Sequence, residues 1–171
     1  DTFLDCIFDE VSEVLNWLPW KHWKDYGHYE VNALELRFEL IDLLHFVVSE
    51  CLLIGITPDK VHRYVVGGER ASVKITNLEE MVNYAKGKVM TDFRLDPSYM
   101  DDKIFITRKL LRTMINLVGD SYGIVTPDIM VSKIMLILFE LFGVWDMTGQ
   151  DIFNYYMSKN QENFDRQERG Y

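Results

Sequence analysis

The sequence contains little cysteine, and this shortage excludes two classes of small protein. Among its 171 residues only Cys6 and Cys51 are cysteines, and both lie in apolar segments without C-x-x-C spacing. A disulfide scaffold or a cysteine-ligated zinc site is therefore not expected. We expect instead a cytoplasmic protein that folds as a single domain over residues 1–171.

Long apolar runs and an excess of basic residues are also missing. The two most apolar stretches, residues 40–56 and 129–145, are interrupted by charged side chains, whereas a membrane span needs about 20 nearly uncharged residues. With 27 acidic and 18 basic side chains, the net charge is −9, which argues against binding to nucleic acid or to an anionic membrane. The same charge permits a small phosphate ligand, because metal ions can invert the charge of a local site.

The hydrophobic pattern has a helical period almost throughout, and strand signals are scarce. Helices are expected over residues 3–17, 31–53, 58–66, 77–86, 101–118 and 127–142, with a last one starting near residue 148. Thr-Pro-Asp at 57–59 and again at 126–128 supplies an N-cap, a first-turn proline and a first-turn acid. Residues 67–76 and 87–97 are predicted to be connecting loops. We therefore predict an all-α helical bundle.

Two pairs of carboxylates are the first candidates for chemistry. Glu10 and Glu13 are three residues apart on one predicted helix, and Glu39 and Asp42 are three apart on the next, so each pair shares a helix face. Asp42 lies in the apolar run ELIDLLHFVV, where burial of an unpartnered carboxylate is costly. Buried carboxylates persist when they are paired or bind a hard cation such as Mg²⁺. Solvated helix faces produce the same spacing, so both interpretations stay open.

A histidine extends the second series. His45 follows Asp42 by three residues, the spacing of acid and histidine in ferritin-like di-iron carboxylate proteins. Such a site needs two acid–histidine pairs, and this sequence offers one. A hydrogen-bonded core histidine is therefore favoured over a metal ligand.

Two further segments could bind phosphate. The run WKHWK at 20–24 suits an aromatic wall beside two cations, or a helix end with basic residues near the C-terminal dipole. In the C-terminal segment Lys159, Asn163 and Arg166 fall on roughly one helical face, where the guanidinium could bind phosphate in a bidentate manner. A charged, frayed tail explains the same composition.

Together, the series EVSE, WKHWK, ELIDLLHF and KNQENFDRQERGY resembles the dimeric all-α dUTPases and the related phage dCTP/dUTP pyrophosphatases. The run WKHWK and the C-terminal pattern are specific to that family. The carboxylate pairs occur more widely, in the all-α nucleoside triphosphate pyrophosphohydrolase superfamily. The resemblance covers about residues 8–49 and 151–171, and residues 57–147 are expected to be a variable, mobile helical segment.

The resemblance implies a homodimeric, Mg²⁺-dependent hydrolase that converts dUTP, and also dUDP or dCTP, to the monophosphate. The implied metal ligands are Glu10, Glu13, Glu39 and Asp42, with Glu13 or Glu10 as the base that deprotonates the attacking water. The implied substrate contacts are Trp20, Lys21, Lys24, Phe46, Lys159, Asn163, Arg166, Gln167 and Tyr171.

Three alternatives stay open. The family has a further N-terminal helix whose Gln and Asn side chains help to read uracil, and the sequence starts just before the first acid pair. A pyrophosphatase for dCTP or for a modified pyrimidine nucleotide is therefore one alternative. A di-iron carboxylate protein and a non-catalytic helical interaction protein are the others.

Overall fold

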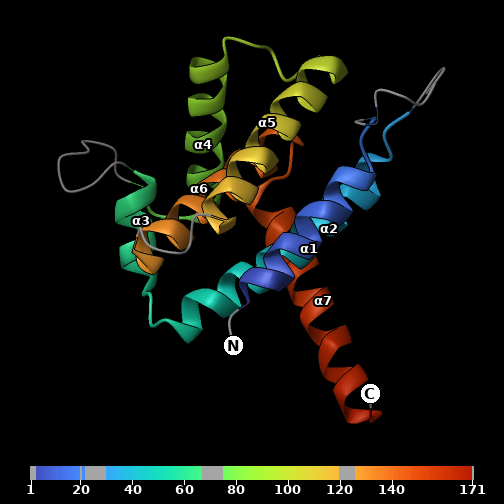
Figure 1. Ribbon diagram of the computed structural model, residues 1–171, viewed down its shortest axis with the longest axis vertical. Helices are drawn as coiled ribbons and strands as arrows, with labels where there is room; N and C mark the ends of the chain where they lie inside the picture. The colour runs from blue at the N-terminus through green and yellow to red at the C-terminus, as the bar shows by residue number, and fades with distance from the viewer. Residues whose placement is uncertain (1–2, 20, 22–29, 67–74, 120–125, 171) are drawn as a thin grey trace.

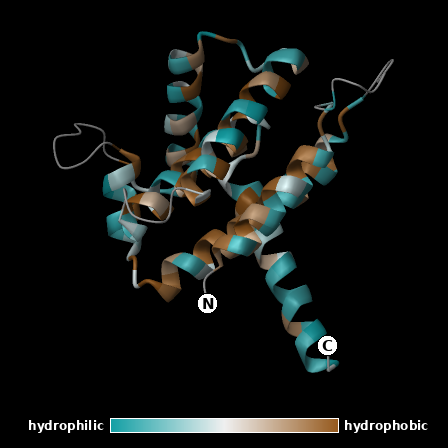
Figure 2. Ribbon diagram, viewed as in Figure 1, coloured by the Kyte–Doolittle hydropathy of each residue, from teal (hydrophilic) through white to brown (hydrophobic). Residues whose placement is uncertain are grey.

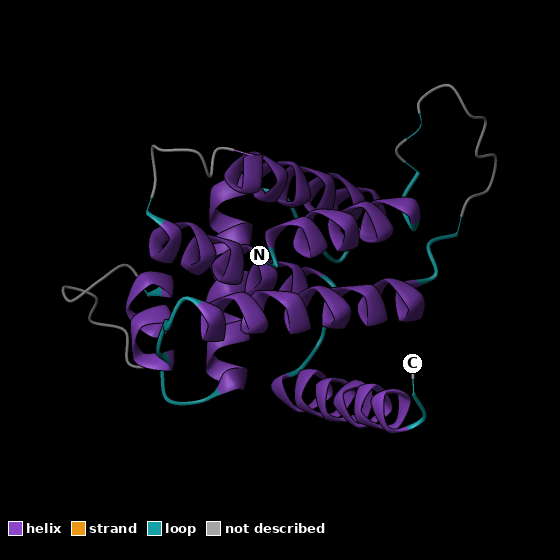
Figure 3. Cartoon of the chain, turned by 60° about the horizontal axis from the view of Figure 1, so that its bottom comes forward, coloured by secondary structure: helices purple, strands orange, loops and turns teal. Residues whose placement is uncertain are grey.

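The computed structural model describes residues 3–19, 21, 30–66, 75–119 and 126–170, and these ranges contain seven helices and no strand (Figures 1 and 3). The helices are α1 (Leu4–Asn16), α2 (Ala33–Leu53), α3 (Pro58–Val65), α4 (Leu78–Phe93), α5 (Met100–Gly119), α6 (Pro127–Val144) and α7 (Gly149–Glu168). The predicted all-α fold is confirmed.

Helix α6 is the centre of the fold because it is apolar on almost all sides. It contacts α2, α3, α4 and α5, and most of its side chains are buried. Figure 2 shows apolar residues, in brown, on the ribbons at the middle of the molecule. Trp145 follows it and is 1% exposed, with its indole N–H donating to Thr107 Oγ1 at 2.9 Å. The segment 57–147 therefore supplies the central helix of the core, and its variability in the family stays a prediction.

The predicted loop over 87–97 is wrong for its first half, since α4 continues to Phe93. Val89 is buried against the core, and Arg94 then ends the helix in the left-handed conformation with φ of 53°. Packing onto α6 stabilises a helix whose local pattern is weak, because tertiary contacts override propensity.

The approach of α4 to α6 depends on one glycine. A Cβ at Gly143 would lie 2.7 Å from Lys86 Cβ and 3.1 Å from Lys86 Cα, so Gly143→Ala should lower the free energy of unfolding by about 1–3 kcal/mol. Gly87→Ala is the matched control on the facing helix, because a Cβ at this position meets nothing within 4 Å. This substitution should raise the free energy of unfolding by about 0.5–1 kcal/mol. Urea unfolding of both variants checks this, and two shifts of the same sign would refute the close contact.

Three helices position the candidate site. Helices α1 and α2 pack along each other, and the backbone N–H of Phe3 donates to the buried Glu50 carboxylate at 2.8 Å just before α1 begins. Helix α7 begins in a capping box formed by Thr148 and Asp151 and packs on α2 and α4, and its second half extends away from the other helices (Figure 1). The C-terminal segment is thus helical to Glu168, rather than frayed.

Among the described helices none alone is long and apolar enough to cross a membrane; α2 and α3 together meet that length and composition test, with a bend of 116° between them.

Candidate active site

Helices α1 and α2 bring three of the four predicted metal ligands together. Glu10, Glu13 and Glu39 each place a carboxylate oxygen within 4.8 Å of the others. The i, i+3 spacing puts Glu10 and Glu13 on one face of α1, and the packing of α1 along α2 brings Glu39 to that face. We call these three residues the carboxylate cluster.

The electrostatics of Glu10 indicate a site for a cation. Its pKa is raised from 4.5 to about 7. Burial of the carboxyl is the largest cause, and negative neighbours add to it, in the order Glu13, Asp42, Glu39 and Asp9. Its Oε2 atom is buried and has no hydrogen-bond partner among the described residues. A buried, unpaired carboxylate oxygen is costly unless a cation binds it, so the cluster fits a hard divalent metal ion.

Glu39 is held in place by Trp17, the residue that follows α1. Its Oε1 accepts a hydrogen bond of 3.0 Å from the indole N–H of Trp17. Burial raises the pKa of Glu39, the bond from Trp17 opposes this, and the neighbouring carboxylate of Glu13 raises the pKa again. Glu39, the member of the carboxylate cluster on α2, is therefore held in one position. Its ionised form is disfavoured until a cation binds nearby.

The fourth predicted metal ligand has a different partner. Asp42 Oδ2 accepts a hydrogen bond of 2.9 Å from Lys159 Nζ, across the contact between α2 and α7. Asp42 still lies close enough to raise the pKa of both Glu10 and Glu39. Lys159 thus places a positive charge beside the acidic site.

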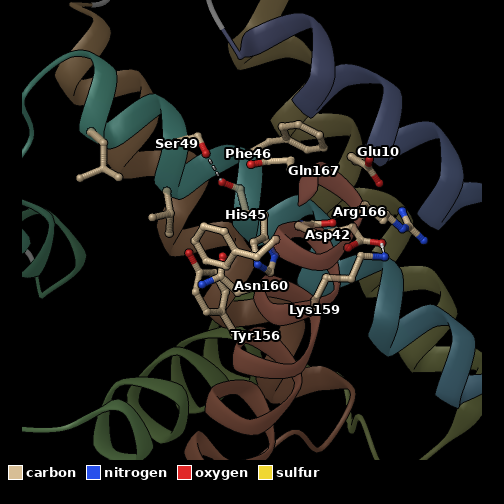
Figure 4. Close-up of a pocket in the computed structure, with 14 residues that line it drawn as sticks. Glu10, Asp42, His45, Phe46, Ser49, Tyr156, Lys159, Asn160, Arg166 and Gln167 are labelled. Carbon is tan, nitrogen blue, oxygen red and sulfur yellow. Dashed lines mark hydrogen bonds and ion pairs between the residues drawn. The ribbon is translucent and has the colours of Figure 1, made fainter. Parts of the chain in front are cut away.

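A cavity of about 540 Å³ opens beside the cluster, between α1, α2 and α7 (Figure 4). Seven of the residues predicted from the sequence line it: Glu10, Asp42, Phe46, Lys159, Asn163, Arg166 and Gln167. The Arg166 guanidinium forms an ion pair with Glu162, one turn earlier on α7. The cavity therefore has carboxylates on one wall, cations and amides on another, and an aromatic ring between them.

The remaining predicted substrate contacts are not placed in the cavity. Trp20, Lys24 and Tyr171 lie outside the described residues. Lys21 is described and half-buried, and it is not among the described residues that line the cavity. Their roles stay predictions from the resemblance.

The sequence interpretation missed part of the lining. His45 was predicted to be a hydrogen-bonded histidine, and its Nδ1 does lie 2.9 Å from the carbonyl oxygen of Ile41, but its ring also lines the cavity. Tyr156 and Asn160 line it too, each three residues before Lys159 and Asn163. The three-to-four spacing along α7 could have indicated both.

The ferritin-like alternative predicts a histidine among the metal ligands. Within the described part of the chain, the clustered candidate ligands are carboxylates only, as hard cations prefer. His45 instead directs one ring nitrogen to the backbone of its own helix.

Comparison with known proteins agrees with this geometry. A family model described as dUTPase matches residues 2–171, which includes the central helices as well as both segments of the sequence resemblance. No curated protein matches the chain, and no solved structure does. Because the match spans almost the whole chain and the fold is all-α, the protein belongs to the dUTPase family and is a nucleoside triphosphate pyrophosphatase of the dUTP diphosphatase type.

Proposed function

We propose that the protein hydrolyses dUTP to dUMP and pyrophosphate in a Mg²⁺-dependent reaction at the carboxylate cluster. The observation that carries this proposal is the position of the cluster beside a cavity lined by Lys159 and Arg166. Acidic oxygens and cations on facing walls suit a metal–triphosphate, which needs both kinds of partner. Membership of the dUTPase family supports the same assignment.

The metal would be held by Glu10, Glu13 and Glu39, with Asp42 joining them once Lys159 releases it. The buried, unpaired Oε2 of Glu10 supports this set of ligands. When bound there, Mg²⁺ supplies positive charge that stabilises the phosphate oxygens as charge develops on them.

The chain's own residues would carry the proton and the leaving group. Glu13 or Glu10 accepts a proton from the attacking water, whose oxygen forms a bond to the α-phosphorus while the bond to the bridging oxygen of the β-phosphate breaks. Lys159 and Arg166 stabilise the departing pyrophosphate after exchanging their carboxylate partners, Asp42 and Glu162, for phosphate oxygens.

Nucleoside contacts are proposed for the other wall of the cavity. Phe46, Asn163 and Gln167 line it and would contact the sugar and base. The resemblance adds further contacts from residues 20–24 and Tyr171. Hydrolysis of dUDP or dCTP by the same site is part of the proposal.

We also propose a cytoplasmic homodimer. Helix α7 exposes large apolar side chains along its length, with Phe153 57%, Met157 47% and Phe164 55% exposed. Such a row on a helix that extends from the body favours contact with a second copy of the chain.

The substrate assay tests the proposed function directly. Incubation of the protein with dUTP, dCTP, dTTP or dATP should release pyrophosphate from dUTP when Mg²⁺ is present and none in EDTA. The dCTP reaction decides between a uracil-selective and a cytosine-tolerant enzyme. Absence of pyrophosphate from every nucleotide, in a protein with a normal helical circular dichroism spectrum, would refute the proposal.

A further inference from the structure

The turn between α6 and α7 has an unusual backbone conformation that ion pairs hold in place. Asp146, just past the end of α6, has φ of 53°, in the left-handed region that residues other than glycine seldom adopt. Its carboxylate forms ion pairs with Lys86 from α4 and Lys103 from α5. A costly conformation of this kind persists where the surrounding structure determines it. The direction in which the chain leaves α6 is therefore fixed by two other helices.

The first residue of α7 lies directly against α4. The backbone N–H of Gly149 donates to Glu79 Oε2 at 2.5 Å, and a Cβ at Gly149 would lie 2.7 Å from the backbone nitrogen of Glu79. The capping box of Thr148 and Asp151 completes the hydrogen bonds of the same turn. Helix α7 thus begins at a position that any side chain on its first residue would change.

Arg37 links this turn to α2. Its guanidinium donates twice to the backbone carbonyl oxygen of Trp145, from Nε at 3.0 Å and from Nη2 at 2.7 Å. Trp145 is the C-cap of α6, directly before Asp146. Helix α2 also carries Glu39 and Asp42, and at about 100° per residue Arg37 lies on a different face of the helix. One helix therefore carries carboxylates of the site together with an anchor for the base of α7.

Because α7 is long, a small change at its base moves its far end by several ångströms. Lys159 and Arg166 lie about 15 and 26 Å along the helix from Gly149, at about 1.5 Å per residue. A tilt of about 10° at the base would displace Arg166 by about 4–5 Å, which exceeds the length of a hydrogen bond. The second half of α7 extends away from the other helices (Figure 1), so its direction depends strongly on the base.

The ion pair of Lys159 with Asp42 also holds α7 on α2, but the proposed reaction opens this pair when phosphate binds. Arg37 takes no part in that exchange, because it binds a backbone carbonyl and is not among the described residues that line the cavity. The attachment through Arg37 therefore persists while Lys159 changes its partner.

We propose that Arg37 is a positioning residue: by binding the Trp145 carbonyl it sets the direction of α7, and with it the place of Lys159 and Arg166 opposite the carboxylate cluster. This inference rests on the proposed function. Loss of the guanidinium should weaken the binding of phosphate groups, because these groups contact α7. It should not weaken Mg²⁺ binding, because the carboxylate cluster lies on α1 and α2.

Two substitutions of Arg37 test this role by titration calorimetry and steady-state kinetics. Arg37→Met removes the guanidinium and keeps an unbranched side chain, whereas Arg37→Lys keeps a cation that can donate to the same carbonyl. With Mg²⁺ present, Arg37→Met should lose about tenfold in affinity for inorganic pyrophosphate and raise KM for dUTP about tenfold, with a smaller effect on kcat. Arg37→Lys should recover most of both losses.

The matched control is Arg63→Met, because Arg63 is an exposed arginine on α3, and it should keep the native values. Native pyrophosphate affinity in Arg37→Met would overturn the proposal. Equal losses of affinity for pyrophosphate and for Mg²⁺ would also overturn it, because they would indicate general damage to the fold.

A distance measurement tests the direction of α7 without turnover. Spin labels are attached to cysteines introduced by Asp101→Cys on α5 and Glu168→Cys at the end of α7, with Cys6→Ser in the background, and the buried Cys51 is kept. Pulsed electron paramagnetic resonance should show a shifted or broader distance distribution in Arg37→Met and the native distribution in the control.

A second variant disturbs the same base from the side of α4. In Gly149→Ala the new Cβ must displace the backbone of Glu79, so the label distance should change and the pyrophosphate affinity should fall while the Mg²⁺ affinity is retained. This variant tests the proposal even if Arg37→Met does not fold. A native distance in folded Gly149→Ala would show that the base does not set the direction of α7.

The outcomes separate the two proposals. Pyrophosphate release from dUTP by the native protein, with an unmoved label distance in Arg37→Met, would overturn the role of Arg37 alone. A displaced α7 in Arg37→Met, without pyrophosphate release from any triphosphate by the native protein, would overturn the proposed reaction alone.

Discussion

Replacing Glu39 with glutamine should lower the rate of pyrophosphate release on the order of 1,000-fold, with the helical fold intact. The change removes one negative charge from the carboxylate cluster, whose three oxygens lie within 4.8 Å of one another. The amide oxygen can still accept the hydrogen bond that Trp17 now donates at 3.0 Å, so the side chain keeps its position. Activity is lost because the cluster no longer carries enough charge to hold a divalent cation beside the triphosphate.

The same variant should be more stable than the native protein when metal is absent. Burial and the charge of Glu13 disfavour the ionised form of Glu39, and a neutral amide relieves both effects. Loss of activity with a raised unfolding midpoint in EDTA is therefore the expected combination, measured by pyrophosphate assay and urea titration. Asp5→Asn is the control, since Asp5 is an exposed acid on α1 outside the cluster. A Glu39→Gln enzyme with the native rate would show that the reaction occurs elsewhere.

The helix starts could be predicted from the sequence because their causes are local. Thr57 and Thr126 precede Pro58 and Pro127, and in both cases the helix begins at the proline. Gly55 follows α2 with φ of +70°, as expected for a glycine just past a helix end. The full extent of α4 could not be predicted, because it depends on contacts with a helix that begins more than thirty residues later.

The candidate site was predictable in its composition and less so in its partners. The i, i+3 spacing of the acids determines which side chains share a face, and the structure places three of them together. The contact between Asp42 and Lys159 joins residues 117 positions apart, so it depends on how α7 crosses α2. The stacking of the His45 ring on the Tyr156 ring, with centroids 4.0 Å apart, depends on the same crossing. Spacing within a helix is local information, whereas pairing between helices is not.

The carboxylate cluster should make the metal-free protein less stable as the pH rises. The folded protein keeps the Glu10 proton up to a pKa of about 7, whereas the unfolded chain loses it near the ordinary value of 4.5. Between these values the folded state binds more protons than the unfolded state, so the free energy of unfolding falls as the pH increases. A bound cation should remove this penalty, because it favours the ionised carboxylate.

Mg²⁺ affinity should therefore depend steeply on pH, with Glu10 as the group responsible. The metal must displace the Glu10 proton, so the affinity should fall by about tenfold for each pH unit below about 7 and level off above it. Calorimetric titration of Mg²⁺ in buffers with different ionisation enthalpies would report one released proton near pH 6 and almost none at pH 8.5. Glu10→Gln should abolish that release and weaken binding at every pH, whereas Asp9→Asn should keep it with a slightly lower midpoint, since Asp9 makes the smallest contribution to the raised pKa. Proton release that persists unchanged in Glu10→Gln would assign the titrating group to another member of the cluster.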